Sequence, residues 1–132
     1  MACVFCDRLA AGDLAAGDLA VENELVAAFS DAFPLTRGHT LVVSRRHEAD
    51  YFGLTADEQT ALWQLVNRVR HRIERELRPG GYNLGVNVGQ AAGQTVGHVH
   101  IHLIPRYAGD VDDPRGGIRW IIPAKARYWE QA

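Results

Sequence analysis

The stretch of sequence that decides the fold is residues 98–104, which reads His-Val-His-Ile-His-Leu-Ile. Successive side chains of a β-strand point to opposite faces, so this pattern places all three imidazoles on one face and Val99, Ile101 and Leu103 on the other. Core strands normally carry apolar residues on both faces or mixed polar residues outward. Three histidines at a strict period of two therefore indicate a functional face on a strand whose other face is buried.

The elements on either side of this strand predict an α+β domain. Apolar or alternating runs predict an antiparallel sheet of five strands, over residues 19–22, 24–29, 39–44, 82–88 and 98–104. The first two flank the turn former Asn23, and we expect the last to end at Pro105. Strands arranged around a single helix, without alternating βαβ units, favour α+β architecture with an antiparallel sheet.

One long helix is predicted between the third and fourth strands. Thr55 and Glu58 have the spacing of a capping box, in which each side chain caps the backbone of the other residue. Apolar residues then recur at helical spacing, at Leu62, Val66, Val69, Ile73 and Leu77. Residues 79–81, Pro-Gly-Gly, end the helix.

Composition and charge exclude several classes of protein. The 132 residues are 47% hydrophobic and 23% charged, which is ordinary for one globular domain. A formal net charge of -2 lacks the basic surface expected of a nucleic-acid-binding protein, so we expect no nucleic-acid partner. No apolar run has the length of a membrane span, and the first residues do not resemble a signal peptide. We therefore expect a cytoplasmic protein with no membrane partner.

Two segments offer no clear chemistry. Residues 9–13 and 14–18 repeat Leu-Ala-Ala-Gly-Asp in tandem, which predicts a short flexible connector or the first turn of a weak helix. The tail beyond Tyr107 is predicted to be mostly irregular.

Cys3 and Cys6 form a Cys-x-x-Cys pair at the N-terminus. In a reducing compartment this spacing indicates half of a metal site or a redox pair. A redox motif of the thioredoxin type follows a strand, and no strand precedes Cys3, so the metal site is favoured. Two unrelated thiols remain the alternative.

The histidine face itself leaves two chemical interpretations. His-x-His on a strand can bind a metal, but such sites normally need a further ligand, and no Asp or Glu lies between Gly89 and Gly109. The other interpretation is nucleophilic catalysis, in which one histidine attacks while its neighbours orient it and balance charge.

Residues 93–106 resemble the signature of the histidine-triad (HIT) superfamily, in which three histidines alternate with apolar residues after a Gly-Gln-Ser/Thr-Val run. Residues 29–31 and 38–43 are similar to the family's ribose-binding loop and to the strand that carries its fourth histidine. The resemblance covers about residues 3–107. It implies a single HIT domain over residues 1–132, with a C-terminal tail at 108–132, and a homodimer whose sheet continues across the interface.

The resemblance implies hydrolysis or transfer at the α-phosphate of a nucleotide, with adenine as the expected base. His100 would be the nucleophile that forms a nucleotidyl-histidine intermediate, His102 would assist the leaving group, and His39 would orient the triad, with His98 completing the catalytic set. Contacts to ribose and phosphate are implied for four further residues, Asp31, Asn87, Gln94 and Thr95. No acidic pair or Walker-type lysine is present, so we expect no Mg²⁺-dependent catalysis.

A structural zinc is also implied, because several bacterial members complete a Cys-x-x-Cys pair with two histidines. The corresponding residues here are His47 and His98, which with Cys3 and Cys6 make four ligands. An N-terminus without metal remains the alternative.

The branch of the superfamily is left open by the motif. Within the family, His102 favours hydrolases over uridylyltransferases and phosphorylases with Gln at that position. The resemblance implies a purine nucleoside phosphoramidate or a dinucleoside polyphosphate as the expected substrate. Arg106, Arg115 and Arg119 are candidates to meet distal phosphates, or are solvated surface residues. A nucleotidyltransferase, a phosphorylase and a non-catalytic nucleotide-binding sensor or adaptor remain alternatives.

Overall fold

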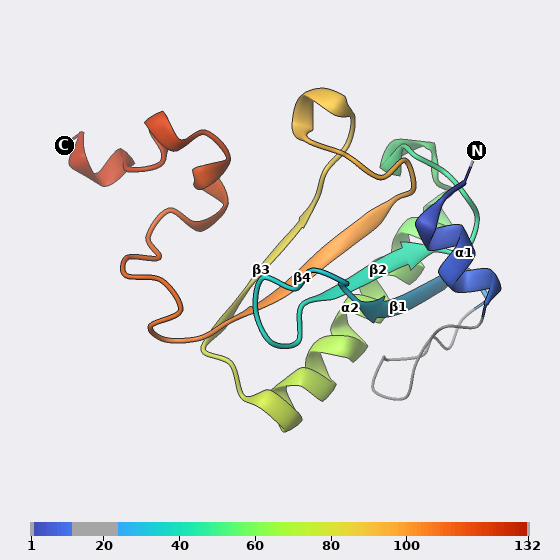
Figure 1. Ribbon diagram of the computed structural model, residues 1–132, viewed down its shortest axis with the longest axis horizontal. Helices are drawn as coiled ribbons and strands as arrows, with labels where there is room; N and C mark the ends of the chain where they lie inside the picture. Colours follow the sequence, from blue (N-terminus) through green and yellow to red (C-terminus); the bar gives the residue numbers. More distant parts are fainter. Residues whose placement is uncertain (1, 12–23, 132) are drawn as a thin grey trace.

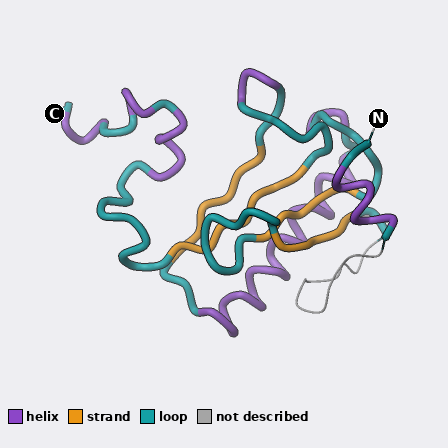
Figure 2. The backbone as a smooth tube through the Cα atoms, in the orientation of Figure 1, coloured by secondary structure: helices purple, strands orange, loops and turns teal. Residues whose placement is uncertain are grey.

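The computed structural model describes residues 2–11 and 24–131. They form an α+β domain with a four-stranded antiparallel sheet in the order β1-β2-β4-β3 (Figures 1 and 2). The strands are β1 (Val26–Ser30), β2 (Thr40–Ser44), β3 (Gly81–Val86) and β4 (His100–Arg106). Two α-helices flank them, α1 (Val4–Ala10) and α2 (Ala56–Leu77). The predicted α+β class with an antiparallel sheet and one long helix is confirmed.

Helix α2 begins and ends where the sequence predicted. The Thr55 hydroxyl accepts a hydrogen bond from the Glu58 N–H at 3.1 Å, and the Glu58 carboxylate accepts one from the Thr55 N–H at 2.9 Å. Both bonds satisfy N–H groups that the first turn of a helix leaves without partners. The helix ends at Leu77, and Arg78 caps it in the left-handed conformation with a φ of 47°.

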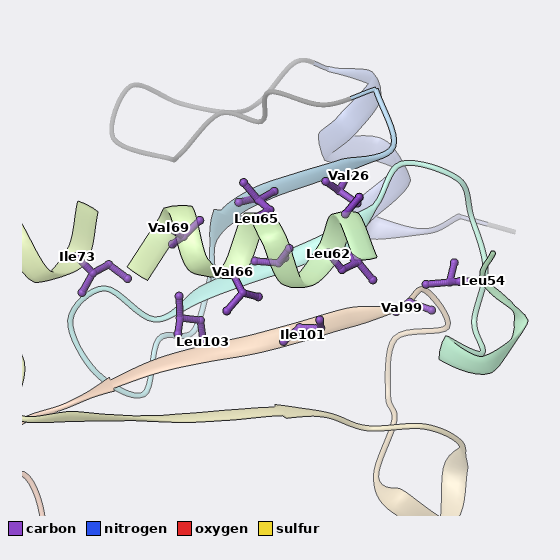
Figure 3. Close-up of a cluster of buried hydrophobic side chains, with 13 residues drawn as sticks. Val26, Leu54, Leu62, Leu65, Val66, Val69, Ile73, Val99, Ile101 and Leu103 are labelled. Atoms are coloured by element: carbon purple, nitrogen blue, oxygen red, sulfur yellow. The ribbon is translucent and has the colours of Figure 1, made fainter. Parts of the chain in front are cut away.

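The main core lies between α2 and one face of the sheet (Figure 3). Leu62, Val66, Val69 and Ile73 of α2 are buried there, and Leu77 is partly buried at its edge. The sheet contributes the apolar positions that alternate with the histidines, Val99, Ile101 and Leu103. The alternation predicted for residues 98–104 is therefore correct, and it leaves the imidazoles on the face away from α2.

A smaller cluster covers that second face of the sheet. Phe5 of α1 is buried against Phe29, with their ring centroids 5.5 Å apart, and packs with three further apolar residues of β1 and β2, namely Ala27, Leu41 and Val43. The sequence did not predict α1, because seven residues are too few to establish a helical period. Cys3 caps this helix, and its sulfur accepts a hydrogen bond from the Cys6 N–H at 3.5 Å.

The strand predictions need two corrections, and one predicted strand is not tested. The described residues form four of the five predicted strands, and the strand predicted over 19–22 lies outside the described residues. Strand β4 begins at His100, so His98 lies in the segment just before it. The strand also continues through Pro105, contrary to the prediction. The Pro105 carbonyl accepts a hydrogen bond from the Thr36 hydroxyl, on the side away from β3. Because the amide nitrogen faces the same side, the proline removes no ladder bond.

The tail is more ordered than predicted. It contains three short 3₁₀ helices, at Gly117–Ile121, Pro123–Lys125 and Tyr128–Glu130. Ala126, which follows the second of them, is fully buried. Figure 1 shows this segment on the opposite side of the molecule from α1. Part of the tandem repeat, from residue 12 on, lies outside the described residues. Within the described chain, no helix combines the length and apolarity needed to cross a membrane.

Replacing Leu62 by alanine tests the main core. Leu62 is fully buried in α2, so Leu62→Ala is expected to lower the free energy of unfolding by about 2–5 kcal/mol. Leu35→Ala is the matched control, because Leu35 is 74% exposed, and its cost is expected within about 0.5 kcal/mol. Urea denaturation followed by circular dichroism measures both, and equal costs for the two variants would contradict this core.

Candidate active site and metal centre

A cavity of about 410 Å³ lies on the histidine face of the sheet. It is bounded by α1, by the loop after β1 and by the loop before β4. Its volume lies in the range typical of small-molecule sites. Five residues that the sequence singled out line it, namely Asp31, Asn87, Thr95, His100 and His102.

The hydrogen bonding of His100 directs one ring nitrogen toward this cavity. Its Nδ1 lies 2.8 Å from the carbonyl oxygen of His98. A carbonyl oxygen only accepts, so Nδ1 carries the proton and donates it. In the neutral ring, Nε2 therefore holds a lone pair. His100 is buried and lines the cavity, so this lone pair is held in a fixed direction in a largely dehydrated place.

A second chain of hydrogen bonds sets the tautomer of His102. The Leu35 N–H donates to His39 Nδ1 at 3.0 Å, so the neutral His39 ring carries its proton on Nε2. His39 Nε2 lies 3.0 Å from His102 Nδ1 and donates to it. His102 consequently keeps its proton on Nε2, as a donor beside the His100 ring, whose centroid lies 5.1 Å away.

Burial keeps these two supporting histidines neutral. Desolvation, followed by the neighbouring His100 and His39, lowers the pKa of His102 to about 4. Desolvation also lowers the pKa of His39, against the opposing pull of the Asp31 carboxylate. At neutral pH His39 and His102 are therefore both neutral, which is the state that the hydrogen bonds between them require.

Asp31 lies at the cavity wall and contacts His39. Its Oδ1 accepts a hydrogen bond from the Phe33 N–H at 2.8 Å, and its Oδ2 lies 3.4 Å from His39 Nε2. The candidate ligand atoms of Asp31, His39 and His102 lie within 4.8 Å of one another, which is close enough to surround a metal ion. The donor set argues against this, because His39 accepts a backbone N–H on Nδ1 and must carry a proton on Nε2, where a metal would bind.

Cys3, Cys6, His47 and His98 form a separate cluster, whose ligand atoms all lie within 4.8 Å of one another. The Cys6 sulfur lies 3.3 Å from His47 Nδ1, and both sulfurs lie 3.5 Å from His98 Nδ1. A tetrahedral zinc ion holds sulfur and nitrogen ligands about 3.5 Å apart. Two thiolates and two imidazoles in this arrangement are a donor set that fits zinc.

Contacts outside the ligands orient His98 and hold the loop that carries His47. His98 Nε2 donates to the Ser44 carbonyl at 2.6 Å, which leaves the lone pair on Nδ1, facing the sulfurs. The loop that carries His47 is tied to α2, because Arg46 makes two hydrogen bonds to Glu58, at 2.9 and 3.1 Å. The Arg46 guanidinium lowers the pKa of Glu58 to about 2, so this pair stays charged.

Several residues lie apart from the cavity, contrary to the sequence-based expectation. Both nitrogens of His98 are engaged in the metal cluster and with Ser44, so His98 offers no atom to a substrate. Gln94 is not one of the residues that line the cavity in the described part of the chain. Its amide holds the loop before β4 through bonds to Gly89, Ala49 and Val96.

The candidate phosphate-binding arginines of the C-terminal part are engaged with other groups. Arg106 forms two hydrogen bonds to Asp110, at 2.7 and 2.8 Å, and Arg115 pairs with Asp113. Arg119 donates to the Lys125 carbonyl and stacks on the Tyr128 ring. None of the three lines the cavity within the described part of the chain.

Sequence reasoning missed the N-terminal wall of the cavity. Val4, Phe5 and Arg8 of α1 line it, as does Phe33, which is 87% exposed. The Arg8 guanidinium lies 3.9 Å above the Phe29 ring and donates to the Ser30 carbonyl at 2.9 Å. Val4, Phe5 and Arg8 lie between and beside the two cysteines, and this position was the signal that could have placed them at the cavity. A metal at Cys3 and Cys6 would bring this segment to the histidine strand.

This arrangement of fold and site is that of the histidine-triad class, and the chain belongs to it. The HIT domain family model matches residues 15–109. An uncharacterized HIT-like protein of Methanocaldococcus jannaschii is 40% identical over 110 residues, which cover 82% of this chain and 81% of that protein.

Two relatives from Schizosaccharomyces pombe carry enzyme names. The adenosine 5'-monophosphoramidase is 36% identical over 106 residues, covering 80% of this chain and 75% of that protein. The asymmetrical bis(5'-nucleosyl)-tetraphosphatase is 39% identical over 91 residues, covering 69% of this chain and 50% of that protein. The family thus includes hydrolases of nucleotides.

A solved structure matches over the whole length. The zinc-bound histidine-triad family protein of Mycobacterium smegmatis has a TM-score of 0.72 and 31% identity, and the match covers 100% of this chain and 99% of that one. That relative and the four-residue cluster here together point to metal binding.

The low pKa of His102 predicts how stability depends on pH. The unfolded chain, where histidine has a pKa of about 6.5, binds the proton more readily than the folded protein. The free energy of unfolding should therefore fall as the pH drops from about 6.5 toward 4, and be fully present above pH 6.5.

His102→Gln removes this titration, so urea denaturation from pH 7.5 to 4 should give a shallower pH dependence than the wild type. His71→Gln, which replaces an exposed histidine of α2, is the control for losing one imidazole. Parallel curves for the wild type and His102→Gln would contradict the assignment of a neutral, buried His102.

Proposed function

We propose that the protein is a nucleotide hydrolase that acts at the α-phosphate of purine nucleoside phosphoramidates or dinucleoside polyphosphates. The observation that carries the proposal is the pair of oriented imidazoles at the cavity. His100 donates from Nδ1 to a fixed carbonyl, and His102 accepts on Nδ1 from His39. One ring therefore offers a lone pair and the other a hydrogen-bond donor, which suits a displacement at phosphorus.

In the first step, the His100 Nε2 lone pair attacks the α-phosphorus. A nitrogen–phosphorus bond forms while the bond to the leaving group breaks. The departing amine takes its proton from a water molecule, which becomes hydroxide, and the His102 Nε2–H stays in place and donates a hydrogen bond to that oxygen. The His98 carbonyl stabilises the positive charge that develops on the His100 ring, since it accepts the Nδ1 proton. The product of this step is a nucleotidyl-histidine.

In the second step, the hydroxide attacks the same phosphorus from the side that the leaving group vacated. The bond to His100 breaks, and the electron pair returns to His100 Nε2. The enzyme returns to its starting state and releases the nucleoside monophosphate. The Asp31 carboxylate accepts hydrogen bonds from ribose hydroxyls, and Asn87 and Thr95 contact the ribose or phosphate at the cavity wall.

Phosphoramidates are the substrate class that we favour. A dinucleoside polyphosphate carries further phosphates, for which cationic side chains are the usual partners. Arg106, Arg115 and Arg119 are engaged elsewhere, so they give no support to such contacts. The leaving group of a phosphoramidate is a small amine, which carries no further phosphate and needs no cationic partner.

We also infer that Cys3, Cys6, His47 and His98 hold a structural zinc. Bound there, the ion supplies a fixed cross-link between the N-terminus, the loop after β2 and the segment before β4. The four side chains use all tetrahedral positions, which leaves none for a substrate.

The homodimer with a continuous sheet stays a prediction. Strand β3 lies at one edge of the sheet, and it is the strand that would join the two copies.

Replacing the nucleophile tests the mechanism. His100→Ala is expected to bind AMP but to lose more than 99% of the turnover of an adenosine phosphoramidate, because the covalent route needs this nitrogen. The measurement is a substrate panel that includes diadenosine polyphosphates, with product identification by chromatography. Mass spectrometry of the quenched wild-type reaction should find a nucleotidyl adduct on His100.

His71→Ala is the control and is expected to keep full activity, since His71 is exposed on α2. Retention of more than about 1% of wild-type turnover by His100→Ala would contradict the nucleophile assignment. Binding of AMP with no turnover of any panel substrate by the wild type would instead favour a non-catalytic sensor.

Zinc content tests the metal centre. Protein purified without chelators is expected to contain about one zinc per chain, and His47→Gln is expected to lower that content while His71→Gln leaves it unchanged. The double variant Cys3→Ser, Cys6→Ser should lose the metal and lower Tm by at least about 5 °C. It should keep part of its turnover at saturating substrate, because His100 is intact. A wild type free of any divalent metal, with its Tm unaffected by added zinc, would refute the site.

A further inference from the structure

Helix α1 takes part in both sites at once. Cys3 and Cys6 contribute its two sulfurs to the metal cluster. Val4, Phe5 and Arg8, which lie between and beside those cysteines, form a wall of the cavity. Because the helix is only seven residues long, a metal that holds its first turn also holds the wall.

Phe5 is the side chain that connects the two sites most directly. It is buried, with 7% of its surface exposed. Its ring centroid lies 5.8 Å from that of the metal-cluster residue His98 and 5.0 Å from that of His100, in both cases edge to face. The position of this ring therefore limits where the His100 imidazole can lie.

A second connection runs through the backbone before β4. His98 faces the cysteine sulfurs with Nδ1, and its own carbonyl accepts the Nδ1 proton of His100. The residue that would bind the metal thus also holds the acceptor that sets the tautomer of His100. A shift of His98 on loss of the metal would move this acceptor.

The contacts of α1 with the rest of the described chain are few in kind. Phe5 and Leu9 pack in the smaller apolar cluster, and Arg8 lies over the Phe29 ring and donates to the Ser30 carbonyl. Isolated helices shorter than about 12–15 residues are marginal in water. A metal at the cysteines would therefore add a fixed anchor to this wall, at the first turn of the helix.

We propose that the metal at Cys3, Cys6, His47 and His98 sets the affinity of the cavity for nucleotide, with Phe5 as the positioning residue that transmits the effect. The proposal rests on the proposed function and deepens it, since it makes the metal centre a regulator of the nucleotide site. Loss of zinc releases α1, withdraws Phe5 from His100 and opens one wall of the cavity.

Linkage makes the effect reciprocal. If zinc tightens the binding of AMP by a given factor, AMP tightens the binding of zinc by the same factor. Coupling between two sites commonly amounts to a factor of about 5–150. Since one short helix and one backbone carbonyl join these two sites directly, we expect at least about a tenfold effect.

Calorimetric titration with AMP tests the proposal on the full chain, loaded with zinc or stripped by a chelator and checked for folding by circular dichroism. Removing zinc is expected to raise the Kd for AMP at least about tenfold, and adding zinc back should restore it. Phe5→Ala should bind AMP weakly in both states, with the zinc effect reduced to within about twofold, whereas Phe5→Leu should retain most of it.

Phe52→Ala is the matched control, because Phe52 is 74% exposed in the short helix Tyr51–Gly53 and lines no part of the cavity. It should show the wild-type dependence on zinc. A merely structural role of Phe5 would weaken AMP binding but leave the ratio of the two Kd values unchanged, so the ratio is the decisive quantity.

An equilibrium competition measures the same coupling from the side of the metal, and it also covers the case in which stripped protein unfolds. The Kd for zinc, measured against a chromogenic chelator of known affinity, is expected to fall at least about tenfold when AMP is saturating. An equal Kd for zinc with and without AMP, or an equal Kd for AMP in folded loaded and folded stripped protein, would overturn the proposal. If loaded protein binds no AMP at all, the proposed function fails instead, which is a distinguishable result.

Discussion

The alternation of faces along residues 98–103 is the constraint on which the rest of the structure depends. Val99, Ile101 and Leu103 are buried against α2, so the register of β4 cannot shift by one residue without exposing them. The same register holds His98, His100 and His102 on the opposite face. Hydrophobic burial on one side of a single strand therefore positions the imidazoles on the other side.

Burial of the imidazoles has a chemical consequence as well as a cost. Removing His102 and His39 from water disfavours their charged forms, so both are held neutral at physiological pH. A neutral imidazole has one donor and one acceptor nitrogen, and fixed backbone groups decide which is which. The Leu35 N–H donates to His39 and so fixes the tautomers of His39 and His102. The His98 carbonyl accepts from His100 and so fixes the tautomer of His100. The site is thus organised before any substrate binds.

The N-terminal segment shows how a small domain completes its second sheet face. Helix α2 covers one face with a long apolar stripe, whereas α1 has a single buried side chain, Phe5. Four candidate metal ligands from three separate segments surround the start of α1. The Ser44 carbonyl orients His98 among them, and the Arg46–Glu58 pair fixes the loop that carries His47. A metal cross-link at this point would add to the small apolar area that a seven-residue helix can bury.

The amino-acid sequence by itself determined the α+β class, the limits of α2 and the face that each histidine occupies, because periodicity, capping and turn residues are local properties. It also indicated Cys3 and Cys6 as half of a metal site. Only the tertiary structure decided that α1 forms the cavity wall, that Gln94 and His98 point away from the cavity, and that Pro105 continues β4. These features arise from contacts between segments far apart in the chain, such as Cys3 with His98 and His39 with His102, which no local pattern specifies.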